Sequence, residues 1–233
     1  MTVISDLSQF SFVDIADRAP RASSTVLSIR AGGTRSPVFC IHSIDGRAGR
    51  YAALAAHIDG DRPVYGVETS ASVPRASSVS ALAERYADDI LAVRGNGPIN
   101  LLGVSFGGLL AHAVAVALQL RGLAVNSLAL LGSSPVQSRC ESADEPAHEL
   151  LAGIGADVDR SRAEELVALA TDHQELAKQH FPGVYRGKAL VVSTVGSDAG
   201  AAWHAFVSGT VSKYEVPDAS AFGLVGPLVN RHL

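Results

Sequence analysis

Short apolar runs alternate along this chain with longer segments that carry helical periodicity. Runs rich in apolar or β-branched residues predict buried strands at residues 25–30, 37–42, 63–68, 99–104, 125–131, 188–195 and 211–216. Helical patterns lie between or beside them, at residues 49–58, 80–94, 106–121, 161–180 and 199–207. This alternation predicts an α/β fold whose mostly parallel sheet is covered by helices on both faces.

The segment 80–94 shows the helical pattern most clearly. Leu82, Tyr86 and Ile90 recur at helical spacing, and Ser80 is a candidate N-cap for the helix that carries them. The run Gly-Asn-Gly-Pro at 95–98 then ends the helix and starts the next strand.

Two regions depart from the alternation. Residues 1–24 show little periodicity and predict a loose N-terminal arm, which leaves 25–233 as one folded domain. Residues 136–182 interrupt the pattern with a polar opening, a short apolar piece and a charged amphipathic helix. We interpret them as a helical insertion, either a lid over a functional site or a surface excursion with no gating role.

Composition excludes several classes of protein. The net charge of −4 and the scattered Lys and Arg residues give no basic footprint for nucleic acid. The chain has no run of 18 apolar residues to span a membrane, and its first 20 residues do not read as a signal peptide. Cys40 and Cys140 are expected to be reduced thiols in a cytoplasmic protein, and the Cys and His spacing predicts no metal site.

The sequence Gly103-Val104-Ser105-Phe106-Gly107 follows a predicted strand and begins a predicted helix. A G-x-S-x-G motif between a strand and a helix is the nucleophile elbow of the α/β-hydrolase fold. The serine of such an elbow is exposed at the carboxyl end of the sheet, near the positive end of a helix dipole. Ser105 is therefore the candidate nucleophile, and residues 136–182 would form the lid.

From residue 25 onward the chain resembles the thioesterase domains of polyketide and non-ribosomal peptide synthetases. Residues 37–46 are similar to the strand that ends in H-P-x-G-G in that family, and 51–58 with 61–67 resemble its Y-x-x-L-A-x-x-L and D-R-P-V-Y-G-L run. Residues 99–108 match its L-L-G-x-S-x-G-G elbow, and 216–227 resemble its closing V-P-G-x-H-F-x-x-L-x-x-P stretch.

The resemblance implies acyl transfer from the phosphopantetheine arm of a carrier protein to Ser105, with no cofactor held by the domain itself. Water or an internal nucleophile would then release the chain as an acid or a ring. The backbone N–H groups of Ile44 and Phe106 match the oxyanion positions, and His42 matches a histidine that shapes the oxyanion loop. The expected partners are an acyl carrier protein or a polyketide or peptide synthase, together with an acyl or polyketide substrate.

The acid of the catalytic triad is missing from its usual place. The family's string L-L-D-S corresponds here to residues 130–133, in which Gly132 occupies the aspartate position. Some members of the family carry the acid one strand later, and Asp198 matches that alternative. Asp198 is equally placed to cap the helix predicted at 199–207.

The histidine base is missing as well. The closing segment reads Val-Pro-Asp-Ala-Ser-Ala-Phe at 216–222, without a histidine and with one residue more than the family's spacing. His204 follows Asp198 by six residues, and His112 lies about two helical turns after Ser105, where it would line the pocket or the core. The remaining candidates, His173 and His180, lie on the predicted lid helix and would either reach over the nucleophile or face solvent.

The predicted oxyanion loop also differs from the family, which prefers small residues there. Asp45 and Arg47 place a carboxylate and a guanidinium in this loop. They form either an exposed ion pair at the loop tip or a remodelled site that transfers protons or binds anions.

Three functions remain open on these grounds. The first is a thioesterase that uses Ser105 with an unusual base. The second is a cyclase or dehydratase that has repurposed the thioesterase pocket, and the third is a pseudoenzyme that binds a carrier protein or an acyl chain. The missing triad members favour the last two, whereas the intact glycines of the elbow favour the first two. The initial Met is consistent with a standalone chain.

Overall fold

A computed structural model describes residues 25–69, 74–94, 97–136 and 160–233. The predicted arm at 1–24, Cys140 and the first part of the predicted lid insertion lie outside these described residues. Cys40 is buried and free, and burial raises the pKa of its thiol.

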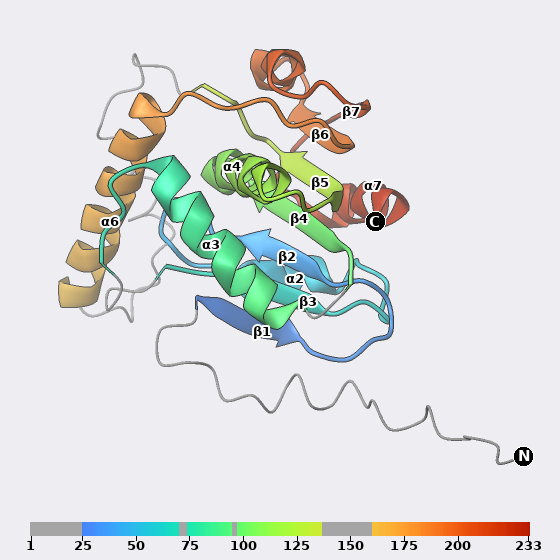
Figure 1. Ribbon diagram of the computed structural model, residues 1–233, viewed down its shortest axis with the longest axis horizontal. Coiled ribbons are helices and arrows are strands. Elements are labelled where there is room, and N and C mark those ends of the chain that lie inside the picture. Colours follow the sequence, from blue (N-terminus) through green and yellow to red (C-terminus); the bar gives the residue numbers. More distant parts are fainter. Residues whose placement is uncertain (1–24, 70–73, 95–96, 137–159) are drawn as a thin grey trace, which may run out of the picture.

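The centre of the domain is a seven-stranded sheet with the order β1-β3-β2-β4-β5-β6-β7 (Figure 1). β1 pairs antiparallel with β3, whereas all the other neighbours are parallel. The strands are β1 (Val26–Arg30), β2 (Val38–Ile41), β3 (Val64–Val67), β4 (Ile99–Val104), β5 (Val125–Leu131), β6 (Ala189–Thr194) and β7 (Val211–Val216). The predicted strands are confirmed to within one residue at each end.

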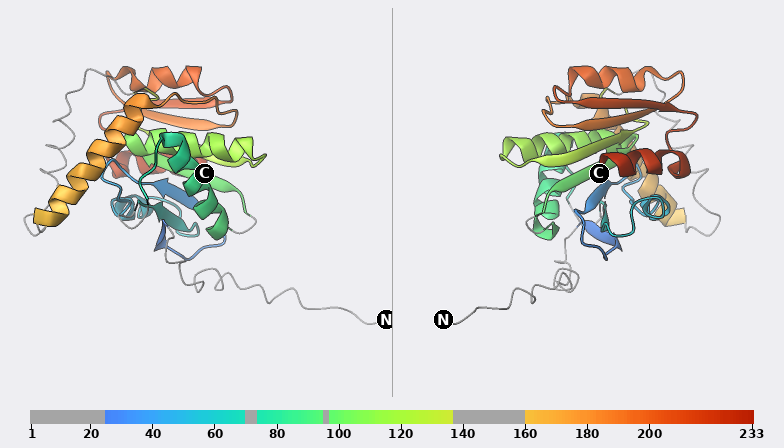
Figure 2. Two further views of the ribbon diagram at one scale, coloured as in Figure 1. Left: turned by 60° about the vertical axis from the view of Figure 1, so that its left-hand side comes forward. Right: turned by 90° about the vertical axis from the view of Figure 1, so that its right-hand side faces the viewer.

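Helices cover both faces of the sheet, as predicted. α3 (Val79–Val93) and α4 (Phe106–Leu120) pack side by side on one face, and α2 (Tyr51–Ala55) and α7 (Phe222–His232) pack on the other (Figures 1 and 2). Each face buries its own hydrophobic cluster. The strands that end at the functional site are therefore held from both sides.

α6 (Arg160–Gln179) is not part of either layer. It lies across the end of the sheet at which the parallel strands finish, at the left of Figure 1. The carboxyl ends of parallel strands share one edge, so this helix covers the edge at which ligands bind in open α/β sheets.

The structure corrects two local predictions and adds one helix that was not predicted. The N-cap of α3 is Ser78, whose hydroxyl accepts a hydrogen bond from the Ala81 N–H at 3.0 Å, and Ser80 lies inside the helix. The helix predicted at 199–207 is a 3₁₀-helix, η1 (Asp198–Ala205). α7 was not predicted as a helix, because Pro227 and two glycines interrupt its pattern. None of the described helices has both the length and the apolar character that crossing a membrane requires.

Candidate functional site

Ser105 joins β4 to α4 in a strained turn. Its backbone angles are φ 52° and ψ −121°, and among the described residues it is the only one other than glycine with a positive φ. The turn is fixed by a hydrogen bond of 2.9 Å from the Ser105 N–H to the Leu131 carbonyl of the neighbouring strand. Ser105 is exposed although both flanking elements are buried, and strain of this kind persists where a function requires it.

The glycines around Ser105 are required by space. A Cβ on Gly103 would lie 2.0 Å from the Gly107 carbonyl oxygen, and one on Gly107 would lie 2.6 Å from the His42 carbonyl oxygen. A Cβ on Gly108 would lie 2.5 Å from the side chain of Ser133. The close approach of β4, α4 and β2 therefore depends on the absence of these side chains.

Tyr51 stabilises the elbow through hydrogen bonds to the ends of β2 and β4. Its buried hydroxyl donates a hydrogen bond to the Ile41 carbonyl at 2.7 Å and accepts one from the Val104 N–H at 3.1 Å. One side chain of α2 thus joins the ends of β2 and β4, directly before the two segments that would form the reaction site. Sequence reasoning had no signal for this role, because it depends on a contact between distant segments.

The predicted oxyanion loop, residues 43–47, is a tight turn after β2. The Gly46 N–H donates to the Ser43 carbonyl at 3.0 Å, and the Arg47 N–H donates to the Asp45 carboxylate at 3.1 Å. In the described part of the chain, the N–H groups of Ile44 and Phe106 have no hydrogen-bond acceptor. Both groups are thus available for an oxyanion.

His42 is fully buried behind this loop. Its Nδ1–H donates to the Ser43 carbonyl and its Nε2 accepts from the Tyr86 hydroxyl, each at 2.6 Å, which assigns the neutral tautomer. Burial, with a smaller contribution from nearby His173, lowers the pKa of His42 to about 3. Both ring nitrogens are occupied, so His42 holds the loop and is unsuited to act as a base.

His112 lies on α4 and is fully buried in the core. Its Nε2–H donates to the Phe206 carbonyl at 3.0 Å, and its ring packs against Trp203 at 4.8 Å. Burial lowers the pKa of His112 to about 4. The structure therefore places His112 among core residues rather than beside Ser105.

Because His42 and His112 are buried in their neutral form, we predict that the stability of the fold decreases in acid. They stay neutral in the folded protein well below the pKa of about 6.5 that they have in an unfolded chain, so the unfolded chain binds more protons on acidification. The free energy of unfolding should fall as the pH falls below 6.5, by about 2 kcal/mol per histidine between pH 7.5 and pH 5. Urea denaturation at the two pH values measures this loss. His112→Leu should remove about 2 kcal/mol of this loss, and equal stability of the wild-type protein at both pH values would contradict the prediction.

Gly132, the position that the resemblance implies for the acid, lies against the segment after β7, residues 217–221, which is called the closing loop here. Gly132 follows β5 with φ +52°, and a Cβ built on it would lie 3.3 Å from the Cβ of Ala219, which is 2% exposed. The nearby Asp218 carboxylate accepts hydrogen bonds from the backbone and the hydroxyl of Ser220, and these bonds lower its pKa. The fold thus brings together the two segments that should carry acid and base, but the contact consists of a glycine and an alanine.

The alternative acid and base lie on η1. Asp198 and His204 are both exposed, and neither has a hydrogen bond or ion pair to Ser105 among the described contacts. Asp198 stands in the first turn of η1, where an acidic residue suits the helix dipole. The structure therefore shows no polar contact of Asp198 or His204 with Ser105, and a role for either in catalysis stays a prediction.

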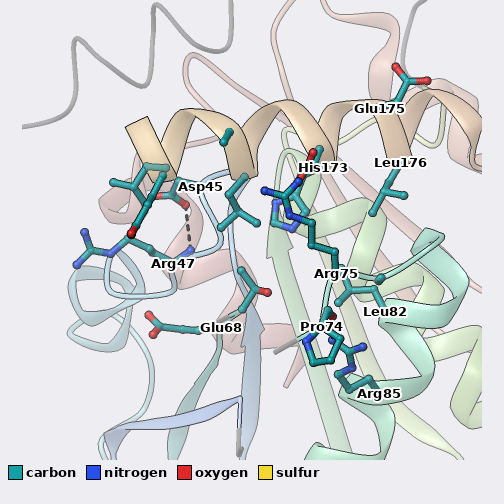
Figure 3. Close-up of a pocket in the computed structure, with 17 residues that line it drawn as sticks. Asp45, Arg47, Glu68, Pro74, Arg75, Leu82, Arg85, His173, Glu175 and Leu176 are labelled. Carbon is teal, nitrogen blue, oxygen red and sulfur yellow. Dashed lines mark hydrogen bonds and ion pairs between the residues drawn. The ribbon is translucent and has the colours of Figure 1, made fainter. Parts of the chain in front are cut away.

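A pocket of about 700 Å³ opens between α6 and the sheet edge (Figure 3). It is called the α6 pocket here, and its lining includes Asp45, Arg47, Glu68, Arg75, Leu82, Arg85, Leu166, Leu169 and His173. Asp45 and Arg47 meet through the backbone of Arg47, so they do not form the side-chain ion pair that was one of their two interpretations. Charged and apolar groups both face this space, which suits a ligand of mixed polarity.

His173 connects the α6 pocket to the elbow. It lines the pocket, and its ring stacks on that of Phe106 at 5.1 Å and on that of His42 at 5.0 Å. His173 is 3% exposed, and burial lowers its pKa. The interpretation of His173 as a solvent-facing residue is therefore wrong, whereas His180, at the end of the same helix, lies half-buried.

Comparison with known proteins gives a consistent family. A family model for the thioesterase domain matches residues 36–210, and this match ends before β7 and the closing loop. Malpinin synthetase of Mortierella alpina is 31% identical over 246 residues, which cover 91% of this chain and 3% of that protein. A probable non-canonical non-ribosomal peptide synthetase, CymA of Salinispora arenicola, is 38% identical over 133 residues, which cover 54% of this chain and 2% of that protein.

Solved structures show the same fold. The thioesterase domain of NocB, from the nocardicin cluster, superposes with a TM-score of 0.70 at 23% identity and covers 89% of this chain and 94% of that domain. The same domain has been solved as a covalent complex with a fluorophosphonate nocardicin G analog. The Vlm2 thioesterase domain with a bound dodecadepsipeptide superposes at 0.73 with 18% identity, covering 90% of this chain and 98% of that one.

Proposed function

Because the chain belongs to the thioesterase domain family, we propose that it transfers an acyl or peptidyl chain through Ser105 in the biosynthesis of a polyketide or non-ribosomal peptide. The observation that carries the proposal is the strained Ser105, held between glycines that nothing larger can replace. Its position at the start of α4, beside the free N–H groups of Ile44 and Phe106, favours the oxyanion of a tetrahedral intermediate.

The chemical step is the attack of Ser105 Oγ on a thioester carbonyl. The C–S bond breaks, the thiol leaves, and the hydroxyl proton passes to the leaving sulfur or to water, since no histidine stands in the closing loop. Water or an internal nucleophile of the substrate then releases the chain from the serine ester. Without a neighbouring base, the rate is expected to be about 10³-fold or more below that of a complete triad.

The pocket and the relatives support a proposal for the substrate and for its delivery. We place part of the acyl or peptidyl chain in the α6 pocket, whose volume of about 700 Å³ and mixed charges suit a peptide-like group. The curated relatives are long synthetases of which the chain spans only a few per cent. A carrier protein or synthase is therefore the proposed partner that delivers the thioester.

A fluorophosphonate probe tests this proposal. The wild-type protein should gain one phosphonyl adduct by intact mass spectrometry, whereas Ser105→Ala and Ser105→Gly should gain none. The glycine variant also removes the strain at φ 52°, so its lack of labelling cannot be attributed to a distorted turn. Release of thiol from a simple acyl thioester should likewise depend on Ser105.

One observation favours a second function. The contact between Gly132 and Ala219 carries no ionisable group where a triad needs two, which suits a pocket that binds a chain or promotes a non-hydrolytic step such as cyclisation. Absence of both labelling and thiol release in the folded wild-type protein would favour this second function. Labelling that is equal in Ser105→Ala would also contradict the first.

A further inference from the structure

α6 packs directly onto the predicted oxyanion loop, through Leu169. Gly46 has φ +77°, and a Cβ on it would lie 2.6 Å from Leu169 Cδ2 of α6 and 2.3 Å from Thr69 Cγ2. Leu169 and His173 are four residues apart, so they project from the same face of the helix. The loop is therefore held between the end of β3 and α6.

His173 contacts both residues whose N–H groups would bind the oxyanion. Its Nδ1–H donates a hydrogen bond of 2.7 Å to the carbonyl oxygen of Ile44. Its ring lies nearly parallel to that of Phe106, with the centroids 5.1 Å apart and an interplanar angle of 23°. Ile44 follows β2 and Phe106 begins α4, so a single side chain of α6 restrains two segments that are far apart in the sequence.

The surroundings of His173 hold its side chain in one orientation. The ring also stacks on His42, at 5.0 Å and 25°, and His42 is itself held by Ser43 and Tyr86. A side chain that is 3% exposed and stacked on two rings has little rotamer freedom left. The hydrogen bond to Ile44 therefore restrains the peptide that follows this residue, and with it the direction of the loop.

We propose that His173 is a positioning residue that fixes both oxyanion donors, so that α6 is a structural wall of the reaction site rather than a lid that opens freely. This inference rests on the proposed function, because it assigns a purpose to the N–H groups of Ile44 and Phe106. It applies to the orientation of those donors and requires no proton transfer by His173.

Four variants test the proposal. His173→Phe keeps a ring for the stacks but removes the donor, His173→Asn keeps a donor near the position of Nδ1 but removes the ring, and His173→Ala removes both. Ala177→Gly is the matched control, since Ala177 is 3% exposed on the same helix, packs in the core and does not line the α6 pocket. It should lower the melting temperature without changing the loop.

The first readout is the rate of fluorophosphonate labelling under conditions in which all variants are folded. The maximal labelling rate should fall at least tenfold in His173→Phe and further in His173→Ala, with little change in the probe concentration at half-maximal rate. His173→Asn should recover part of the loss relative to His173→Ala. Ala177→Gly should label at the wild-type rate, because a loss of stability elsewhere in α6 does not move the donors.

The second readout is independent of activity. Amide hydrogen exchange in residues 43–47 should be faster in the His173 variants and unchanged in Ala177→Gly. If the wild-type protein fails to label, the proposed function fails, and the exchange experiment still decides whether His173 fixes the loop. If His173→Ala exchanges its loop amides at the wild-type rate and is also labelled at the wild-type rate, the inference is overturned.

Discussion

Replacement of Gly103 by alanine is expected to remove a large part of the stability of this domain. The added Cβ would lie 2.0 Å from the Gly107 carbonyl oxygen, 2.2 Å from its carbon and 2.5 Å from the Gly108 nitrogen. All three are backbone atoms of the first turn of α4, so no flexible side chain can move aside. Separation of β4 from α4 would open the core on that face, at a cost of roughly 3 kcal/mol or more.

A loss of this size is a large fraction of the 5–15 kcal/mol that typically stabilises a domain. We expect Gly103→Ala to give little folded protein, or a melting temperature lower by about 10 °C or more, measured by circular dichroism. Gly49→Ala is the matched control, because a Cβ on Gly49 meets no atom within 4 Å, and it should melt close to the wild type. A Gly103→Ala protein that also melts close to the wild type would contradict the described elbow.

The strands could be predicted closely because most of them are buried on both faces. In β2, β4 and β5 nearly every residue is buried, so the sequence shows continuous apolar runs that end where the strands end. α7 could not be predicted, since Gly223, Gly226 and Pro227 all lower helix propensity. The structure explains Gly226 by tertiary contact: a Cβ there would lie 2.4 Å from the Cβ of His57, on the segment after α2.

The candidate site was only partly predictable, because part of it also depends on contacts between distant segments. A local motif identified Ser105, and the family resemblance suggested Ile44 and Phe106 as its oxyanion donors. The supports of that motif come from distant segments: Tyr51 bridges β2 and β4, and His173 reaches the loop from α6. Side-chain contacts of this kind carry no local pattern, so only the folded chain reveals them.

The register of the closing loop was also undetermined in the sequence, because the loop has one residue more than the family's spacing. In the structure, a Cβ at position 132 points at Ala219, which places the closing loop beside the acid position. The backbone of Gly132, at φ +52°, lies in the left-handed region, in which aspartate and asparagine are tolerated better than other side chains. The fold therefore brings the position of the missing acid beside the closing loop, although an aspartate at position 132 would carry backbone strain.

Restoration of the missing acid and base is expected to convert the protein into a faster thioesterase. We predict that Gly132→Asp combined with a histidine at position 219, 220 or 221 will, for one of the three, raise the hydrolysis of a simple acyl thioester at least 100-fold. General-base catalysis by a positioned histidine is typically worth 10²–10⁴ in rate, and the aspartate orients that histidine. The single substitutions should gain little, because acid and base act as a unit.

The control for this gain is the same double variant with Ser105→Ala, which should return to the background rate if the new base acts through the serine. Because Ala219 is 2% exposed, a histidine there must displace its neighbours, so the folded fraction of each variant is measured by circular dichroism before its rate is compared. A gain that survives Ser105→Ala would assign the activity to the histidine alone. Folded double variants that gain nothing would show that Ser105 is not poised for attack, and the pocket would then be one that binds its chain without opening the thioester.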